Sequence, residues 1–136
     1  MKTSDFVKPL KKLAKTSHAR LSKVACFFIK NGAIISSGVN YNPTGEPMET
    51  EIDGKLVTQP EVIHAEIAAI TAARENKVDL TNSTLFLTMS PCLSCARVIA
   101  KLHICELNYL YEWWDAAALD LLRENHIEIK QIKEEK

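Results

Sequence analysis

The hydrophobic residues near the start of the chain first recur at helical spacing and then gather into two β-prone runs. A Lys-rich stretch with apolar residues three or four positions apart predicts an amphipathic helix over residues 5–16. Its apolar positions are Phe6, Leu10, Leu13 and Ala14. Apolar runs at 24–30 and 33–37 follow, separated by Asn31-Gly32, a dipeptide typical of a tight hairpin turn. We therefore expect one helix and then a pair of antiparallel strands.

Further along the chain, helical and strand patterns alternate after a polar interruption. Residues 38–60 are rich in Asn, Pro, Gly, Thr and Glu, which predicts a long loop with a weaker turn at Asp53-Gly54. The next predicted helices cover residues 60–75, 92–102 and 115–125, and the next predicted strands cover 84–89, 106–111 and 127–132. Because a helix connects the last two strands, the right-handed crossover rule makes them parallel.

This order of elements predicts the fold class. Strands that alternate with helices after an initial hairpin are typical of a sheet covered by helices on both faces. We expect a three-layer α/β/α fold with a five-stranded mixed sheet, and residues 1–136 as a single domain. With 46% hydrophobic residues, a chain of 136 residues can bury such a core without disulfides.

The charges of the chain cancel, which narrows the range of partners. Seventeen basic residues balance seventeen acidic ones, so no overall positive field attracts a long polyanion, and we expect no nucleic acid partner. The sequence has no signal-peptide core and no apolar run of about eighteen residues, so we expect no membrane span. Four cysteines make no disulfide framework. We expect a soluble protein of the reducing cytoplasm, or of the host cytoplasm if the source is viral.

Two short motifs bring together side chains that bind zinc. The first runs from His64 to Glu66, and the second is the Pro-Cys-x-x-Cys stretch from Pro91 to Cys95. Zinc in catalytic sites takes three nitrogen or sulfur ligands and leaves a fourth tetrahedral position open. We predict that His64, Cys92 and Cys95 hold one Zn²⁺. Glu66 is then an uncoordinated carboxylate that can move protons.

A Cys-x-x-Cys pair by itself also fits other interpretations. In an intracellular protein it can be a redox pair or half of a structural zinc site. A structural site would need a fourth protein ligand, and the nearest candidates are His103 and Cys105. We interpret both as packing residues. The histidine and glutamate upstream, and the proline before the first cysteine, therefore favour a catalytic centre.

With these motifs the chain resembles the cytidine deaminase superfamily, and within it the deoxycytidylate (dCMP) deaminase family. Residues 63–70 are similar to the family's "HAExNAI" stretch, residues 91–99 to its "PCxxCAxxI" stretch, and residues 38–42 to its "GxGYNG" loop. Cytidine deaminases of free nucleosides usually have Cys at the position of His64, which argues against them. The chain departs from the family pattern at Pro43, Ala68 and His103.

The resemblance implies zinc-dependent hydrolysis of dCMP to dUMP with release of ammonia, which supplies dUMP for thymidylate synthesis. It makes Glu66 the catalytic proton carrier. It also places the sugar hydroxyl on Asn42 or Asn40, and the base edge on the backbone of Ala65 and Ser90.

The predicted sheet adds further candidates for substrate binding. Tyr111, Trp113 and Trp114 lie at the carboxyl end of a strand, where ligands of α/β proteins bind. We expect one of them to cover the pyrimidine, and a role in an oligomer interface fits these aromatic residues equally well. For the substrate phosphate the candidate is Arg20, which precedes the first strand.

The resemblance also implies assembly and regulation. Many dCMP deaminases are homo-oligomers, hexameric or built on dimers, activated by dCTP and inhibited by dTTP, and such a nucleotide would bring Mg²⁺. The same zinc chemistry could instead act on cytidine or deoxycytidine, on a nucleobase or on tRNA adenosine. An inactive zinc-binding interaction module is the alternative that involves no catalysis, and the presence of Glu66 argues against it.

Overall fold

A five-stranded mixed sheet forms the centre of the computed structural model, which describes residues 3–113 and 115–133. Its strands are β1 (Ala25–Lys30), β2 (Ala33–Val39), β5 (Thr84–Met89), β6 (Glu106–Tyr111) and β7 (Glu128–Gln131). In space they lie in the order β2-β1-β5-β6-β7. Strand β1 is antiparallel to β2 and β5, whereas β5, β6 and β7 are parallel. The predicted mixed sheet and its parallel last strands are therefore confirmed.

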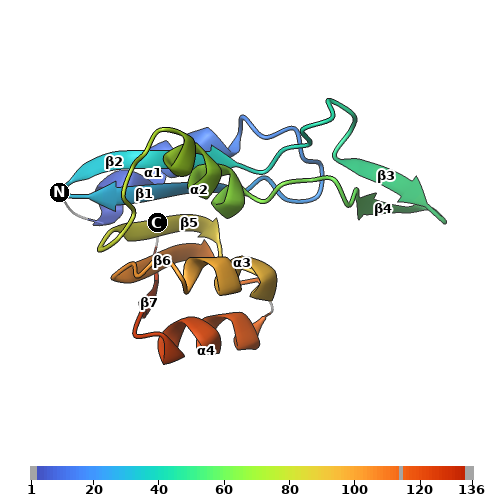
Figure 1. Cartoon of the computed structure of the whole chain (residues 1–136). Helices are drawn as coiled ribbons and strands as arrows, with labels where there is room; N and C mark the ends of the chain where they lie inside the picture. The colour runs from blue at the N-terminus through green and yellow to red at the C-terminus, as the bar shows by residue number, and fades with distance from the viewer. Residues whose placement is uncertain (1–2, 114, 134–136) are drawn as a thin grey trace.

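Helices cover both faces of this sheet (Figure 1). On one face lie α2 (Ala65–Glu75), α3 (Leu93–Ile99) and α4 (Ala116–Glu124). On the other face a short 3₁₀ turn, η1 (Thr3–Phe6), leads into α1 (Val7–Ala14). The predicted three-layer α/β/α architecture is confirmed. Within the described residues no helix combines the length and the apolar content that crossing a bilayer requires.

Neighbouring residues of the central strands belong to two separate cores. In β1, Phe28 packs with the α2, α3 and α4 side, whereas Phe27 packs with the α1 side. Strand β5 repeats the pattern with Leu85 and Phe86. Successive side chains of a strand point to opposite faces, so a sheet covered on both faces needs continuous apolar runs. This explains why β1 and β5 show no alternation in the sequence.

A second, two-stranded sheet interrupts the segment that the sequence predicts to be a loop. Strands β3 (Glu49–Ile52) and β4 (Lys55–Thr58) pair antiparallel across Asp53 and Gly54, whose φ angles are +52° and +78°. The hairpin extends away from the main body (Figure 1). Its strands have only four residues each, too few for the alternation to stand out. The prediction of an irregular loop is therefore wrong for this part of residues 38–60.

Both helices that carry the metal motifs begin later than the sequence predicts. Tyr41 and Ile63 exchange backbone hydrogen bonds of 2.8 and 3.0 Å, which keeps the chain extended up to His64. Helix α2 therefore starts at Ala65, not near residue 60, and His64 is its N-cap. Cys92 is likewise the extended N-cap of α3, which ends at Ile99 instead of residue 102. Tertiary strand pairing has overridden the helical pattern of residues 60–63.

Candidate metal centre

The N-termini of α2 and α3 bring three metal-binding side chains together. His64 Nδ1 lies 3.5 Å from Cys92 Sγ and 3.3 Å from Cys95 Sγ. All three ligand atoms lie within 4.8 Å of one another. Tetrahedral zinc with ordinary Zn–S and Zn–N bond lengths places sulfur and nitrogen about 3.5 Å apart. The donor set and its spacing therefore fit a zinc ion with three protein ligands.

Hydrogen bonds among Cys92, Cys95 and His64 shift the pKa values of all three groups. The Cys95 side chain, and after it His64, stabilise the thiolate of Cys92 and lower its pKa to about 3. The pKa of Cys95 is raised, because its thiol donates to Cys92 and because it is buried. The hydrogen bond to Cys92 also raises the pKa of His64. A metal ion would replace the protons held in this cluster, so binding releases protons.

Glu66 lies beside the three ligands in the first turn of α2 and is only 4% exposed. Burial raises the pKa of its carboxyl group from 4.5 to about 7, although its own backbone N–H and the nearby His64 act in the opposite direction. A carboxyl group with a pKa near neutrality can both accept and return a proton. The proton-carrying role of Glu66 remains a prediction, to which this burial beside the three ligands adds support.

Asp115 links the N-termini of α3 and α4 beside the centre. Its Oδ2 accepts a hydrogen bond from the backbone N–H of Leu93 at 3.0 Å, and its Oδ1 accepts one from Ala118 at 3.2 Å. One carboxylate thus caps α4 and also satisfies an amide in the first turn of α3, directly after Cys92. Carboxylates at helix N-termini are stabilising because the amides there lack helical partners.

The two residues considered as a fourth ligand lie apart from this cluster. Among the described residues, the group able to hold a metal consists of His64, Cys92 and Cys95 alone. His103 and Cys105 lie at the amino-terminal end of β6, whereas the cluster faces the carboxyl ends of the strands. Both side chains are exposed, so the interpretation of both as packing residues is wrong. The prediction that neither is a ligand agrees with the geometry.

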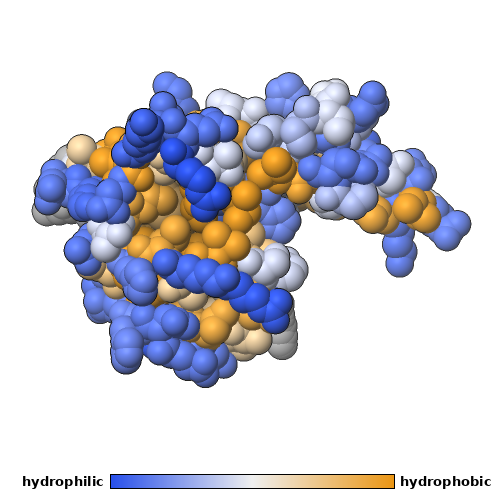
Figure 2. All heavy atoms as spheres, viewed as in Figure 1, coloured by the Kyte–Doolittle hydropathy of each residue, from blue (hydrophilic) through white to orange (hydrophobic). Residues whose placement is uncertain are grey.

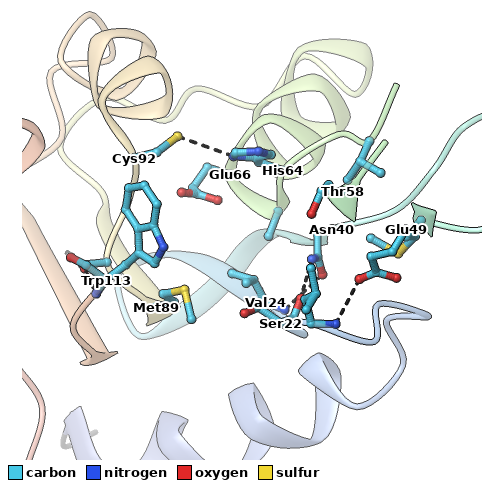
Figure 3. A pocket seen from close by; sticks show the side chains of 15 residues that line it. Ser22, Val24, Asn40, Glu49, Thr58, His64, Glu66, Met89, Cys92 and Trp113 are labelled. Atoms are coloured by element: carbon cyan, nitrogen blue, oxygen red, sulfur yellow. Dashed lines mark hydrogen bonds between the residues drawn. The ribbon is translucent and has the colours of Figure 1, made fainter. Parts of the chain in front are cut away.

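A cavity of about 330 Å³ opens next to the centre (Figure 3). Figure 3 places Glu66, Cys92 and Trp113 on one side of it and Asn40, Glu49 and Ser22 on the other. Its lining residues are Leu21, Ser22, Val24, Asn40, Met48, Glu49, Thr58, Val62, His64, Ala65, Glu66, Met89, Ser90, Cys92 and Trp113. The volume falls in the range of small-ligand sites.

Four of the predicted substrate candidates line this cavity, Trp113 among them, and three do not. Asn40, Ala65 and Ser90 are lining residues. Arg20, Asn42 and Tyr111 are absent from the lining, and Trp114 lies outside the described residues. The backbone of Asn42 forms a turn with Gly45, and its side chain contacts Thr44 and Pro47, beside a separate hollow. The structure therefore brings Asn40, and not Asn42, to the wall of this cavity.

Asn40 is strongly tied to the chain around it. Its Oδ1 accepts hydrogen bonds from Ser17 Oγ at 2.7 Å and from the backbone N–H of Val24 at 3.0 Å. Its Nδ2 donates to the carbonyl of Ser22 at 2.7 Å. Both lone pairs of the amide oxygen are thus used, and one N–H remains. Asn40 fixes the segment before β1 against the cavity.

Ser90 positions the aromatic residue of the cavity. Its hydroxyl accepts a hydrogen bond from the backbone N–H of Trp113 at 2.6 Å and lies 3.2 Å from the Trp113 carbonyl. Its own N–H donates to the carbonyl of Tyr111 at 2.9 Å. These bonds join the carboxyl ends of β5 and β6, and they place Trp113 in the wall. Of the two aromatic candidates that the structure describes, Tyr111 and Trp113, it is Trp113 that lines the cavity.

Sequence reasoning missed the hairpin residues of this site. Glu49 begins β3 and pairs in register with Thr58, the last residue of β4, and both line the cavity. The Asp53-Gly54 turn signals a hairpin, but nothing in the local sequence shows that the base of that hairpin lines the same cavity as His64 and Glu66. That placement depends on the tertiary structure.

The centre and the fold together define the class of protein. Residues 1–111 match the family described as "Cytidine and deoxycytidylate deaminase zinc-binding region", and the chain belongs to this family. It is therefore a zinc-dependent deaminase of the cytidine deaminase superfamily, with His64, Cys92 and Cys95 as the zinc-binding group.

Individual relatives are of moderate similarity. The deoxycytidylate deaminase of Enterobacteria phage T2 is 29% identical over 156 aligned positions, covering 81% of each chain. The deoxycytidylate deaminase of Saccharomyces cerevisiae is 26% identical over 95% of this chain, which spans 44% of the yeast protein. The crystal structure of dCMP deaminase from the cyanophage S-TIM5 in complex with dCMP and dUMP superposes with a TM-score of 0.88. It is 29% identical, with 97% of this chain and 99% of that chain covered.

Proposed function

We propose that this protein deaminates dCMP to dUMP and releases ammonia, supplying dUMP for thymidylate synthesis. The observation that carries the proposal is the buried Glu66 beside the His64, Cys92 and Cys95 group, at the wall of a cavity of ligand size. Support for the substrate comes from the phage and yeast relatives and from the cyanophage enzyme that holds dCMP and dUMP.

The chain's own residues define the proton path of this reaction. Zinc, when bound, lowers the pKa of water and polarises it for attack. Glu66 accepts a proton from the attacking water and delivers it to N3 of the cytosine ring. It then passes the remaining hydroxyl proton to the amine, which leaves as ammonia. The backbone N–H of Ala65 and the carbonyl of Ser90 orient the base edge, and Trp113 covers the ring. Enclosing the pyrimidine between these groups excludes bulk water from the carbon atom that is attacked.

The phosphate must lie outside the zinc end of the cavity. Its lining contains the carboxyl groups of Glu49 and Glu66 and, among the described residues, no Lys or Arg. A phosphate is repelled by such a wall and is directed to the rim. Exposed Arg20 and Lys23 flank the lining residues Leu21 and Ser22 there. Arg20 is therefore our assignment for the phosphate, with Lys23 as a second cation.

The same lining favours one second candidate, deoxycytidine. A neutral nucleoside needs no cation, and the described walls offer none. The test is ammonia release from dCMP, deoxycytidine, cytosine, guanine and a tRNA anticodon stem under matched conditions. We expect the highest kcat/KM for dCMP. A higher kcat/KM for deoxycytidine would replace dCMP by the nucleoside, and turnover of only guanine or of the tRNA stem would refute cytosine chemistry.

Regulation and assembly remain predictions. Repeating the dCMP assay with dCTP or dTTP, with and without Mg²⁺, measures the predicted activation and inhibition. Sedimentation of the zinc-loaded protein measures the predicted homo-oligomer, and a stable monomer would refute it. Limited proteolysis tests the prediction that residues 1–136 form a single domain. We expect no protease-sensitive boundary that divides the sheet. An inactive interaction module would bind zinc and turn over none of these substrates.

A further inference from the structure

A second carboxyl group, that of Glu49, lies at the end of the cavity away from the metal ligands (Figure 3). Its side chain is only 8% exposed, although it belongs to a hairpin that is otherwise mostly exposed. The hairpin extends from the body with the side chains of Ile52 and Val57 exposed. Figure 2 shows hydrophobic spheres on this projecting part of the molecule. Glu49 is thus buried at the base of an exposed element, and its burial needs an explanation.

The chain satisfies only half of this carboxyl group. Oε2 accepts hydrogen bonds from the backbone N–H groups of Arg20 at 2.9 Å and of Leu21 at 3.0 Å. No residue in the described part of the chain donates to Oε1, and no cationic side chain there forms an ion pair with Glu49. A buried carboxyl group is normally surrounded by donors. Glu49 therefore offers an acceptor oxygen at the cavity wall.

The chemistry of the substrate says which group meets this oxygen. A carboxylate only accepts hydrogen bonds, and dCMP has two groups that donate, the exocyclic amine and the hydroxyl on C3′. The amine must lie at the metal centre, because the bond to it is the one that breaks. The phosphate is an anion and is repelled. The hydroxyl on C3′ is the remaining donor.

The neighbouring Asn40 cannot replace Glu49 in this role. Both lone pairs of its amide oxygen are taken by Ser17 and Val24, so it has only an N–H to offer. A sugar hydroxyl could accept from that N–H while donating to Glu49. The two side chains would then hold one hydroxyl from both sides.

We propose that Glu49 is a specificity-determining residue that binds the 3′-hydroxyl of the substrate's deoxyribose through Oε1. This inference rests on the proposed function, because it requires a sugar-bearing cytosine substrate. Glu49 selects nucleotides or nucleosides over free bases, and it orients the sugar so that the phosphate points to the rim. Recognition of the sugar by Glu49 is thus separated in space from the proton transfer at Glu66.

The test compares dCMP with 2′,3′-dideoxycytidine monophosphate, which lacks only the 3′-hydroxyl. We expect wild-type kcat/KM to favour dCMP by roughly 10- to 100-fold, the size of one hydrogen bond to a charged group. In Glu49→Ala this preference should fall well below the wild-type value, to the part that the Asn40 N–H supplies, and in Glu49→Gln it should fall to an intermediate value. The control Glu51→Gln makes the same chemical change in β3 outside the cavity and should keep the wild-type ratio.

The ratio is internal to each variant, so partial unfolding or loss of zinc cancels from it. If Glu49 only holds the loop at Arg20 and Leu21, both substrates lose activity equally and the wild-type ratio survives, which overturns the inference. A wild-type ratio near one also overturns it. If deoxycytidine and not dCMP is the substrate, the proposed function fails but the same ratio is measured with 2′,3′-dideoxycytidine. Turnover of free cytosine alone, or no turnover at all, overturns both.

Discussion

A Cβ atom at Gly38 would lie 2.5 Å from the carbonyl oxygen of Ala65, so β2 and the first turn of α2 are in backbone contact there. The same position would place it 2.6 Å from the backbone nitrogen of Ala69. Nearby, the thiol of Cys26 donates to the Ala65 carbonyl at 3.2 Å. Ala65 follows His64 and precedes Glu66, so this close approach positions both functional side chains on the sheet.

Gly38→Ala should therefore disturb both stability and metal binding. The contacting atoms belong to backbone, which cannot rotate away, so α2 must shift. We expect a loss of about 1–3 kcal/mol in the free energy of unfolding, as for other overpacked sites, and a weaker affinity for zinc. Urea unfolding and zinc titration measure the two effects. Ser37→Ala, at an exposed position of the same strand, is the control and should change neither. A fully stable Gly38→Ala variant would contradict the contact.

Removing the Asp115 side chain, which links α3 and α4, should weaken zinc binding because it destabilises the start of α3. Asp115→Ala leaves the Leu93 and Ala118 amides without their side-chain acceptor. We expect a loss of about 1–2 kcal/mol in unfolding free energy, as for other helix caps. Zinc should also dissociate faster, because Leu93 directly follows Cys92. Asp120→Ala removes an exposed ion pair to Arg123 and should cost less than about 0.5 kcal/mol. Equal effects in the two variants would argue against this link.

Zinc content distinguishes ligand from bystander cysteines. Cys92→Ala removes one of three ligands, so the purified protein should hold far less than one zinc per chain. Cys105→Ala, at the other end of the sheet, should retain one zinc per chain. Atomic absorption on both variants makes the comparison. Full zinc occupancy in Cys92→Ala would show that the cluster is not the binding site.

Glu66→Gln should separate metal binding from catalysis. The amide is of the same size and does not ligate the ion, so one zinc per chain should remain. It cannot accept a proton, and we expect kcat to fall by about 10³-fold or more. Steady-state ammonia release and metal analysis on one preparation give both values. Near-native turnover would remove Glu66 from the proton path.

The raised pKa of Glu66 makes the stability of the metal-free protein depend on pH. Burial raises this pKa from 4.5 to about 7, so the folded protein keeps a proton that the unfolded chain has lost. Stability contributed by the neutral form is complete below about pH 4.5 and is lost as pH rises through 7. The loss approaches about 3 kcal/mol at alkaline pH.

Urea unfolding in the presence of a chelator measures this dependence between pH 5 and 8.5. Glu66→Gln has no such titration, so its stability relative to wild type should increase with pH. Glu51→Gln, at an exposed site, is the control and should follow the wild-type curve. Parallel curves for wild type and Glu66→Gln would show that Glu66 titrates normally.

Much of the fold could be predicted because its signals are local. The Asn31-Gly32 turn needs two consecutive residues with positive φ, and the structure has them at +53° and +76°. The apolar runs of β1 and β5 are continuous because both of their faces are covered. The β3–β4 hairpin was missed because its strands are short and pack against little. Residues 60–63 look helical, but their pairing with Tyr41 lies outside any local window.

The amino-acid sequence by itself predicted the zinc-binding group and Glu66 beside it, because ligation chemistry restricts residue types and a helix start restricts their spacing to a few positions. Only the tertiary structure decided which residues surround them. Asn40 instead of Asn42, Trp113 instead of Tyr111, and Glu49 from a distant hairpin all reach the cavity through contacts between elements far apart in the chain. Such contacts depend on how strands pair and helices pack, and no short stretch of sequence encodes them.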